Sequence, residues 1–400
     1  MGIQPPRLWT KDFILITLTS FFISVMYLSL LTTTTPYVID KFNATESTAG
    51  LAASVFVLGI LLSRLVVGKY LEVIGRKKLF YFGVIFAFIG TLLYFPIENL
   101  TILIILRFFH GIVTGTAFAV MQTVSMDMIP DERRGEGISF FTLNFILALG
   151  IGPFVGIFIN QVATMQTLFI VSTILAGISM VLSCFLSLPK TTITAEQLEE
   201  MKGFRLKDFF EVRVLPIASL IGVLALAYSG LLAFLTTYSL EINLMTAASF
   251  FFIVYAVVVL IFRPITGKVL DKKGDNIVMY PAFLLFSIGL FMLSQAEYGL
   301  IVLLSAVFIG LGFGNLQSAL QAVAIKKVPK YRVGLAISTF FIFHDIGVGL
   351  GPYVLGYLIP AIGYRNMYLT LAVIVGASAF LYYLIHGKKK AFNEQLSSQV

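Results

Sequence analysis

A carboxylic acid, Asp345, follows His344 near the middle of the long apolar run 334–361. Nearly all the other acidic residues of the chain fall in polar stretches or at the ends of apolar runs. An apolar environment disfavours the charged form of a carboxylic acid, so a group placed there can take up and release a proton. We therefore expect proton binding at Asp345 and His344. The alternative is a structural hydrogen bond to a neighbouring helix, with His344 or Arg107 as the donor.

Arg107 is a second charged residue inside an apolar run, 100–124, and it stands one helical turn before Gly111. A charge at the depth of the hydrocarbon costs about 2.5–3.5 kcal/mol on insertion scales, so it needs a cavity or a partner. The alternative is that its long side chain reaches the outer interface. On the same segment, His110 is either a cavity residue or a histidine whose hydrogen bonds are satisfied locally.

Residues for covalent or metal chemistry are scarce. Three histidines and one cysteine cannot build a zinc site of the usual form. The phosphate-binding pattern G-x-x-x-x-G-K-[ST] does not occur, so we expect no direct use of ATP. The chain is expected to be no enzyme and to need no cofactor.

Composition shows what kind of chain holds these residues. Hydrophobic residues make up 58% of it and charged residues 12%, against about 25% charged in a soluble domain. The mean hydropathy is +0.95, which excludes a soluble globular protein. A helix needs roughly 20 residues to cross a bilayer, and most of the apolar runs reach that length. We predict an all-α membrane protein with twelve transmembrane helices at 13–38, 49–71, 79–96, 100–124, 137–160, 165–188, 213–238, 247–270, 277–295, 299–326, 334–361 and 366–386.

The basic residues set the orientation. If the N-terminus is cytoplasmic, nearly all of the 28 Lys and Arg residues lie in cytoplasmic segments or at their membrane boundary. We expect a multi-pass protein of the bacterial cytoplasmic (inner) membrane with both termini cytoplasmic. The formal net charge of +8 then reflects attraction to anionic lipid, and no nucleic-acid partner is expected.

Residues 64–153 recur at 263–352, always 199 positions later. The offset matches glycines, prolines and basic residues, which apolar composition alone would not align. Two copies in one orientation predict two pseudo-symmetric six-helix bundles, an arrangement that suits alternating access. The predicted parts are a bundle at 1–188, a linker at 189–212, a bundle at 213–390 and a tail at 391–400. The linker is interpreted as a solvated cytoplasmic tether, with a partner-binding site as the alternative.

The loop at 68–76 reads Gly-Lys-Tyr-Leu-Glu-Val-Ile-Gly-Arg. It resembles the cytoplasmic-loop signature of the major facilitator superfamily, with Glu72 in place of the usual Asp. The resemblance implies a latch of the outward-facing state, in which Glu72 docks near 334–338 and Arg76 pairs with Asp127. The second copy has Lys326 where the first has Asp127, so we expect it to lack the ion pair. The expected latch residues are Gly68, Glu72, Gly75, Arg76, Asp127 and Asp271.

Arg107, Gly111 and Gly115 resemble a second signature of the superfamily, R-x-x-x-G-x-x-x-G. The resemblance implies that Arg107 takes part in proton coupling. Glycines at this spacing let another helix approach closely.

Glycine and proline stand together inside two predicted helices, where proline removes a hydrogen bond and bends the helix. The first set resembles the helix-5 signature of the superfamily's exporters, with Ala148 and Ile157 in place of two of its glycines. This implies export by a drug:proton antiporter. The alternative is a kink without directional meaning. The residues are Gly152, Pro153 and Gly156, and in the second copy Gly351 and Pro352.

The sequence thus predicts proton-coupled efflux of amphipathic small molecules or drugs by a monomer. The alternative is proton-coupled transport of one metabolite, such as a sugar or an amino-acid derivative. The expected partners are the substrate, protons and the lipid bilayer. Polar residues of the apolar helices are candidates for the cavity lining: Tyr27, His110, Gln122, Asn144, Tyr228, Asn315 and Gln317.

Overall fold

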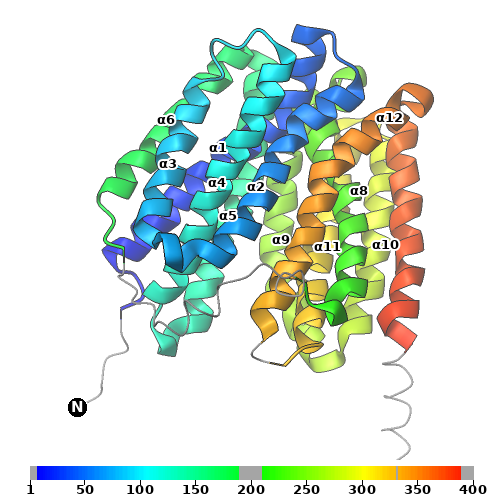
Figure 1. The fold of residues 1–400 in the computed structure, drawn as a ribbon. Helices are drawn as coiled ribbons and strands as arrows, with labels where there is room; N and C mark the ends of the chain where they lie inside the picture. The colour runs from blue at the N-terminus through cyan, green and yellow to red at the C-terminus, as the bar shows by residue number, and fades with distance from the viewer. Residues whose placement is uncertain (1–6, 189–209, 330–331, 389–400) are drawn as a thin grey trace, which may run out of the picture. The chain divides into compact units, whose positions relative to one another are not determined.

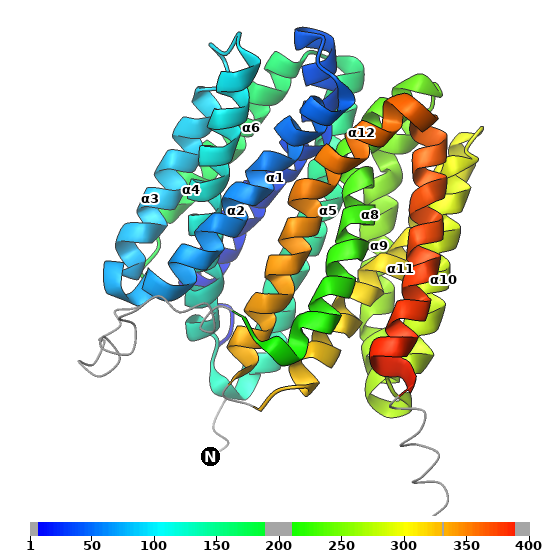
Figure 2. The same cartoon turned by 45° about the vertical axis from the view of Figure 1, so that its right-hand side comes forward.

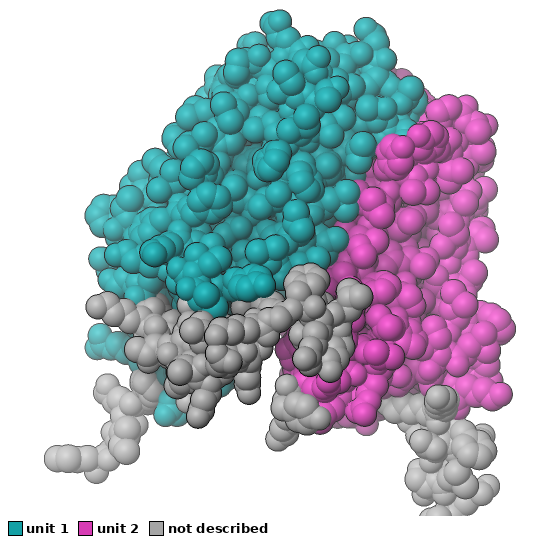
Figure 3. Space-filling model, viewed as in Figure 1, with its two compact units in different colours: residues 1–204 teal, residues 205–400 magenta. Residues whose placement is uncertain are grey.

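The computed structural model describes residues 7–188, 210–329 and 332–388. Every regular element in these ranges is a helix (Figure 1, Figure 2). The chain divides into two compact units, residues 1–204 and 205–400 (Figure 3). Most of the predicted linker, and the whole predicted tail, lie outside the described residues.

The described part of unit 1, residues 7–188, contains six long helices and one short 3-10 turn. Three of the helices begin at a polar residue, Thr10, Thr45 or Asn99, whose side chain accepts a hydrogen bond from a backbone N–H of the first turn. Helix α1 packs along α5 and α6, and α2 packs along α4. The elements are α1 (Lys11–Phe42), α2 (Glu46–Ile74), α3 (Arg76–Leu92), α4 (Leu100–Met128), η1 (Asp131–Arg133), α5 (Arg134–Val162) and α6 (Met165–Cys184).

The glycine pattern of α4 sets the close approach of α4 to α2. A Cβ on Gly111 would overlap the carbonyl oxygen of Phe56, and one on Gly115 would lie 2.8 Å from Cα of Ile60. On α5, a Cβ on Gly156 would lie 2.5 Å from the carbonyl oxygen of Ser29 on α1. The close packing expected from the glycine spacing on α4 is confirmed.

In the residues of unit 2 that the structure describes, 210–329 and 332–388, there are five long helices and two short elements. Helix α12 packs along α8 and α10, and α11 packs along α9 and α10. The elements are η3 (Val212–Val214), α8 (Leu215–Glu241), α9 (Met245–Lys273), α10 (Asp275–Ser294), α11 (Gly299–Lys326), α12 (Val333–Tyr382) and the π-helix η5 (Tyr383–Gly387).

Helix α12 accounts for the difference in helix number between the units. It contains both predicted runs, 334–361 and 366–386, and is bent at Gly363, where φ is +75°. The two arms run in opposite directions, orange and then red in Figure 2. The two helices predicted from the sequence are therefore both present, and the non-helical Gly363 separates them without an intervening loop.

All twelve predicted runs are helical in the described residues. Ten helices are long and apolar enough to cross a membrane, with α12 counted once. Helix α3 has 17 residues and an equally apolar sequence. With the two arms of α12, each unit has six apolar helical segments, as expected of the predicted fold.

Candidate functional site

Asp345 lies on α12 and is 6% exposed. Its Oδ1 lies 3.1 Å from Nδ1 of His344. Nε2 of the same imidazole lies 3.4 Å from Nε2 of Gln317 on α11. The structure therefore brings three predicted residues of unit 2 into one polar cluster. A carboxyl and an imidazole in contact can share a proton and pass it between them.

Arg107 is 1% exposed inside unit 1. Its Nη2 donates to the backbone oxygen of Ala53 at 2.9 Å, and its guanidinium lies 5.7 Å from the centroid of the Phe56 ring. Within the described part of the chain it makes no ion pair with a carboxylate. The side chain is therefore turned into the bundle, which argues against the alternative that it reaches the interface.

An aromatic and histidine cluster surrounds this guanidinium. The hydroxyl of Tyr94 lies 2.9 Å from Nδ1 of His110, whose ring meets the Phe56 ring edge-on with centroids 5.1 Å apart. The Tyr27 ring stacks on the Phe56 ring with centroids 5.0 Å apart. His110 thus has a local partner on one nitrogen, while its buried Nε2 has none among the described residues. Neither Tyr94 nor Phe56 carries a sequence signal that would distinguish it from the many other aromatic residues.

The remaining cavity candidates lie in different surroundings. Asn144 is 5% exposed, whereas Gln122 is exposed. The Tyr228 ring stacks on that of Phe313 at 4.2 Å. Asn315 accepts a hydrogen bond from Thr266 at 2.6 Å, so it joins α11 to α9 rather than to the Asp345 cluster.

At the α2–α3 turn of unit 1, Arg76 forms an ion pair with Asp127, the partner that the resemblance implied. Gly75, between the two helices, has a φ of +99°, which a residue with a side chain rarely adopts. The structure does not describe the surroundings of Gly68 or of the Glu72 side chain. Docking of Glu72 near 334–338 stays a prediction, as does the role of the ion pair as a latch.

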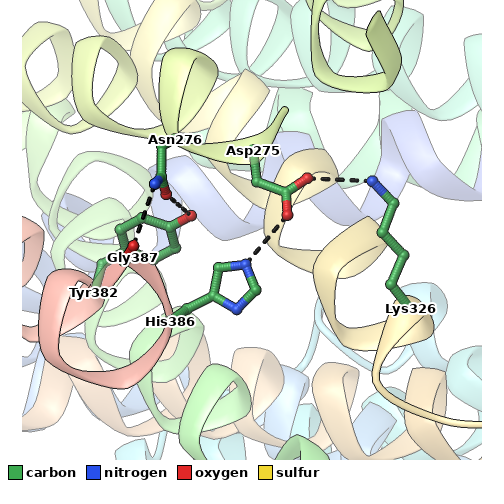
Figure 4. A network of polar contacts seen from close by, with 6 residues as sticks. All are labelled: Asp275, Asn276, Lys326, Tyr382, His386 and Gly387. Carbon is green, nitrogen blue, oxygen red and sulfur yellow. Dashed lines mark hydrogen bonds and ion pairs between the residues drawn. The ribbon is translucent and has the colours of Figure 1, made fainter. Parts of the chain in front are cut away.

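The prediction that the second copy lacks this ion pair is wrong. Nζ of Lys326 lies 3.2 Å from Oδ1 of Asp275 (Figure 4). Asp275 stands 199 residues after Arg76, so both partners have changed sign. The error arose because the repeat offset was applied to Asp127 but not to Arg76.

Asp275 has a second partner near the end of the last helix of unit 2. Nε2 of His386 on η5 lies 3.1 Å from its Oδ2 (Figure 4). Beside it, Asn276 donates to the backbone oxygen of Gly387 at 3.3 Å and accepts from the hydroxyl of Tyr382 at 2.9 Å. The start of α10 is thereby bound to the ends of both α11 and α12.

Glu211 was expected in the solvated linker, but it is 1% exposed. Its Oε2 lies 2.6 Å from Nη1 of Arg332, and its backbone N–H donates to Oγ1 of Thr339 at 2.8 Å. In unit 1 the equivalent arginine, Arg133, pairs instead with the exposed Glu136 three residues on. The last residues of the predicted linker are therefore part of unit 2, since they pack against the start of α12.

Groups of three or more His, Cys, Asp or Glu side chains that could hold a metal ion do not occur among the described residues.

Sequence comparison gives a family for this arrangement. The family model described as Major Facilitator Superfamily matches residues 17–352 and 246–398. An uncharacterized MFS-type transporter of Methanocaldococcus jannaschii is 24% identical over 354 residues, covering 86% of this chain and 90% of the relative. The uncharacterized MFS-type transporter YhhS of Escherichia coli K12 is 24% identical over 364 residues, covering 86% of this chain and 85% of the relative.

Solved structures share the fold. A POT family transporter in complex with a thioalcohol-conjugated peptide superposes with a TM-score of 0.78 at 15% identity, covering 94% of this chain and 96% of that one. The nucleoside transporter NupG superposes with a TM-score of 0.73 at 12% identity, covering 94% of this chain and 99% of that one.

Proposed function

Because this chain belongs to the major facilitator superfamily and is a transporter of the secondary kind, we propose that it exports an amphipathic small molecule in exchange for protons. The proposal includes alternating access by a monomer in the bacterial cytoplasmic membrane, with both termini cytoplasmic. It rests above all on the contact of Asp345 with His344 and, through it, Gln317.

These three residues are not shared by the two copies of the sequence repeat. Their counterparts 199 residues earlier are the apolar residues Ile146, Phe145 and Phe118. A polar cluster that replaces three apolar side chains in a membrane bundle is costly, and ionisable residues at such depth mark proton relays and substrate paths. The cluster is therefore a stronger candidate for coupling than any residue that both copies share.

The proposed cycle follows from the charge of Asp345. A proton that enters from outside neutralises the carboxylate and favours the state that releases substrate outward. Substrate that binds from the cytoplasm then favours loss of the proton to the inside. His344 holds the proton next to Asp345 during the exchange, and Gln317 orients the imidazole from α11.

Arg107 supplies a fixed positive charge in unit 1. Its partners are a backbone carbonyl and an aromatic face, so its charge is not neutralised by a described carboxylate. In the proposed cycle it favours the ionised state of an acid or an anionic group that comes near it. The aromatic cluster of Tyr27, Phe56 and Tyr94 offers apolar contact to an amphipathic substrate.

Export, and membership of the drug:proton antiporter branch, are proposed from the helix-5 residues. Gly152 and Gly156 face α1 closely on either side of Pro153 in α5, and Gly351 and Pro352 take the equivalent place in α12.

The proposal is tested with purified protein in vesicles under an imposed proton gradient. The screen covers cationic dyes, amphipathic antibiotics, a dipeptide and a nucleoside, since peptide and nucleoside are the substrate classes named for the solved neighbours. We expect several amphipathic compounds to move against the proton gradient and to stop when an uncoupler collapses it. Movement of a single metabolite would favour the narrower alternative, and gradient-independent movement would contradict proton coupling.

A further inference from the structure

A cavity of about 280 Å³ lies within unit 2, among α9, α10 and α11. Five of its ten lining residues are polar or charged, and the other five are apolar residues or glycine. The residues that matter to what it could hold are Arg263, Thr266, Gly267, Asp271, Asn315 and Ser318. The volume is at the lower end of that of small-molecule sites, so the cavity suits a ligand of few atoms.

Three of the named lining residues recur in the first copy, since Arg263, Gly267 and Asp271 correspond to Arg64, Gly68 and Glu72. Thr266, Asn315 and Ser318 correspond to Val67, Thr116 and Ala119 in the first copy. Val67 is 4% exposed and belongs to the hydrophobic core of unit 1. Two of the three positions, Thr266 and Ser318, are thus apolar in the first copy, so this part of the polar wall is particular to unit 2.

Arg263 is the strongest indication of a ligand. It lies in the candidate membrane span Met245–Lys273 and lines the cavity, and within the described ranges its guanidinium has no hydrogen bond or ion pair, although its backbone oxygen accepts from Thr266. A charge at membrane depth costs about 2.5–3.5 kcal/mol on insertion scales unless it is partnered or solvated. A guanidinium facing a cavity is suited to a carboxylate, which it can bind through two parallel hydrogen bonds.

Gly267 keeps the cavity open. A Cβ built on it meets no atom within 4 Å, whereas glycines at helix contacts elsewhere in the chain would overlap a neighbour. Asp271 also lines the cavity, eight residues after Arg263 and thus about 12 Å farther along α9. It is exposed, so the cavity has a cationic inner end and an anionic outer end.

This cavity is separate from the Asp345 cluster. Asn315 faces it from α11, while Gln317, two residues on, contacts His344. Two residues turn an α-helix by about 200°, so these side chains leave α11 on opposite faces.

We propose that the cavity binds a small amphoteric solute, with its carboxylate on Arg263 and its ammonium group towards Asp271. Thr266, Asn315 and Ser318 are already hydrogen-bonded to the protein and shape the wall between the two charges. This goes beyond the proposed export, because it concerns equilibrium binding at a site that does not involve Asp345.

The test uses the full chain in nanodiscs of zwitterionic lipid, with calorimetric titration of 4-aminobutyrate and of butyrate, which lacks the amino group. Wild type is expected to bind 4-aminobutyrate more tightly than butyrate. Arg263→Gln is expected to weaken both at least about tenfold, since a hydrogen bond to a charged group is lost. Asp271→Asn is expected to remove the preference for 4-aminobutyrate.

Gly267→Leu provides a steric test, because its side chain would fill the cavity without a clash at Cβ. It is expected to abolish binding. Gly177→Leu is the control, since a Cβ there makes only an ordinary contact at 3.5 Å with Phe88, and Gly177, on α6 of unit 1, does not line the cavity. It is expected to bind as wild type does.

Three results would overturn the proposal: no binding of either probe to wild type, unchanged binding in Gly267→Leu, or unchanged binding in Arg263→Gln. Nanodiscs that contain phosphatidylglycerol test whether the anion that binds Arg263 comes from a lipid headgroup or from a soluble ligand. Loss of 4-aminobutyrate binding in that lipid alone would assign the cavity to a lipid headgroup and overturn the soluble ligand. None of these outcomes depends on whether the protein exports amphipathic compounds.

Discussion

Lys326 and Asp275 form an ion pair at 3.2 Å that repeats, with the signs exchanged, the pair of Asp127 and Arg76 199 residues earlier. Burial follows position rather than charge. The side chains at the start of the third helix of each unit, Arg76 and Asp275, are 9% and 3% exposed. Those at the end of the fourth helix, Asp127 and Lys326, are 45% and 51% exposed. The two units therefore share the contact between these two positions, but the positive and negative residues are exchanged.

The first prediction concerns exchange of the two charges within one unit. Lys326→Asp places two carboxylates together and is expected to lower the unfolding temperature. Adding Asp275→Arg reproduces the arrangement of unit 1 and is expected to restore part of the loss. The coupling between neighbouring residues in such a cycle should be about 0.5–3 kcal/mol, measured by thermal unfolding in detergent.

The matched exchange in unit 1 is Asp127→Lys with Arg76→Asp. We expect it to restore more of the loss than the exchange in unit 2, because His386 also contacts Asp275 and would then face an arginine. Additive effects of the two single substitutions in both units would show that the contacts carry no coupling.

A second prediction concerns the contact of α4 with α2. Gly111→Ala would press a methyl group onto the carbonyl oxygen of Phe56. Forcing an extra carbon into a packed contact costs about 1–3 kcal/mol. Gly334→Ala is the control, since that position is open. Equal unfolding temperatures for the two variants would mean that the close helix contact is not present.

A third prediction concerns Glu211. Glu211→Gln removes the charge that faces Arg332, and the cost of a lost hydrogen bond to a charged group is about 1.5–3 kcal/mol. Glu136→Gln alters the corresponding contact of Arg133 in unit 1, where the carboxylate is exposed and solvent screening leaves the ion pair little effect on stability. Thermal unfolding in detergent should show a larger loss of stability for Glu211→Gln than for Glu136→Gln. Equal losses would contradict the burial of Glu211.

A fourth prediction concerns Arg107. Arg107→Gln is expected to slow proton-coupled transport in vesicles at least about tenfold, as loss of a charged contact of about 1.5–3 kcal/mol implies. Arg107→Lys retains the charge but not the planar donor group, so it should keep an intermediate rate. Transport by Arg107→Gln at the normal rate would leave the residue with a structural role only.

Much of the fold could be predicted because the apolar runs and the repeat are strong, redundant signals. The 199-residue offset, the glycine turns at 75 and 274 and the close contact at Gly111 all follow from residue type and spacing. The last two predicted helices are present as the two arms of α12, but the tightness of their connection could not be predicted, because the turn needs only a single glycine, Gly363, and no loop.

The polar contacts were harder to predict. His344 and Asp345 are neighbours in sequence, but the approach of Gln317 depends on how α11 packs against α12. The contact of Asp275 with His386 spans 111 residues and lies outside the repeated frame. Glu211 looks like a linker residue by composition, and only the packing of η3 against α12 buries it.

The most direct test of the account is proton movement driven by substrate in vesicles that contain a pH-sensitive dye. Once the screen has supplied a substrate, the lumen should change pH in wild type when that substrate is added without an imposed gradient. Asp345→Asn should bind the substrate but move no protons, whereas Asp345→Glu, which keeps the acid, should retain part of the signal. If Asp345→Asn still exchanges substrate for protons at the wild-type rate, the proposed coupling at Asp345 is contradicted.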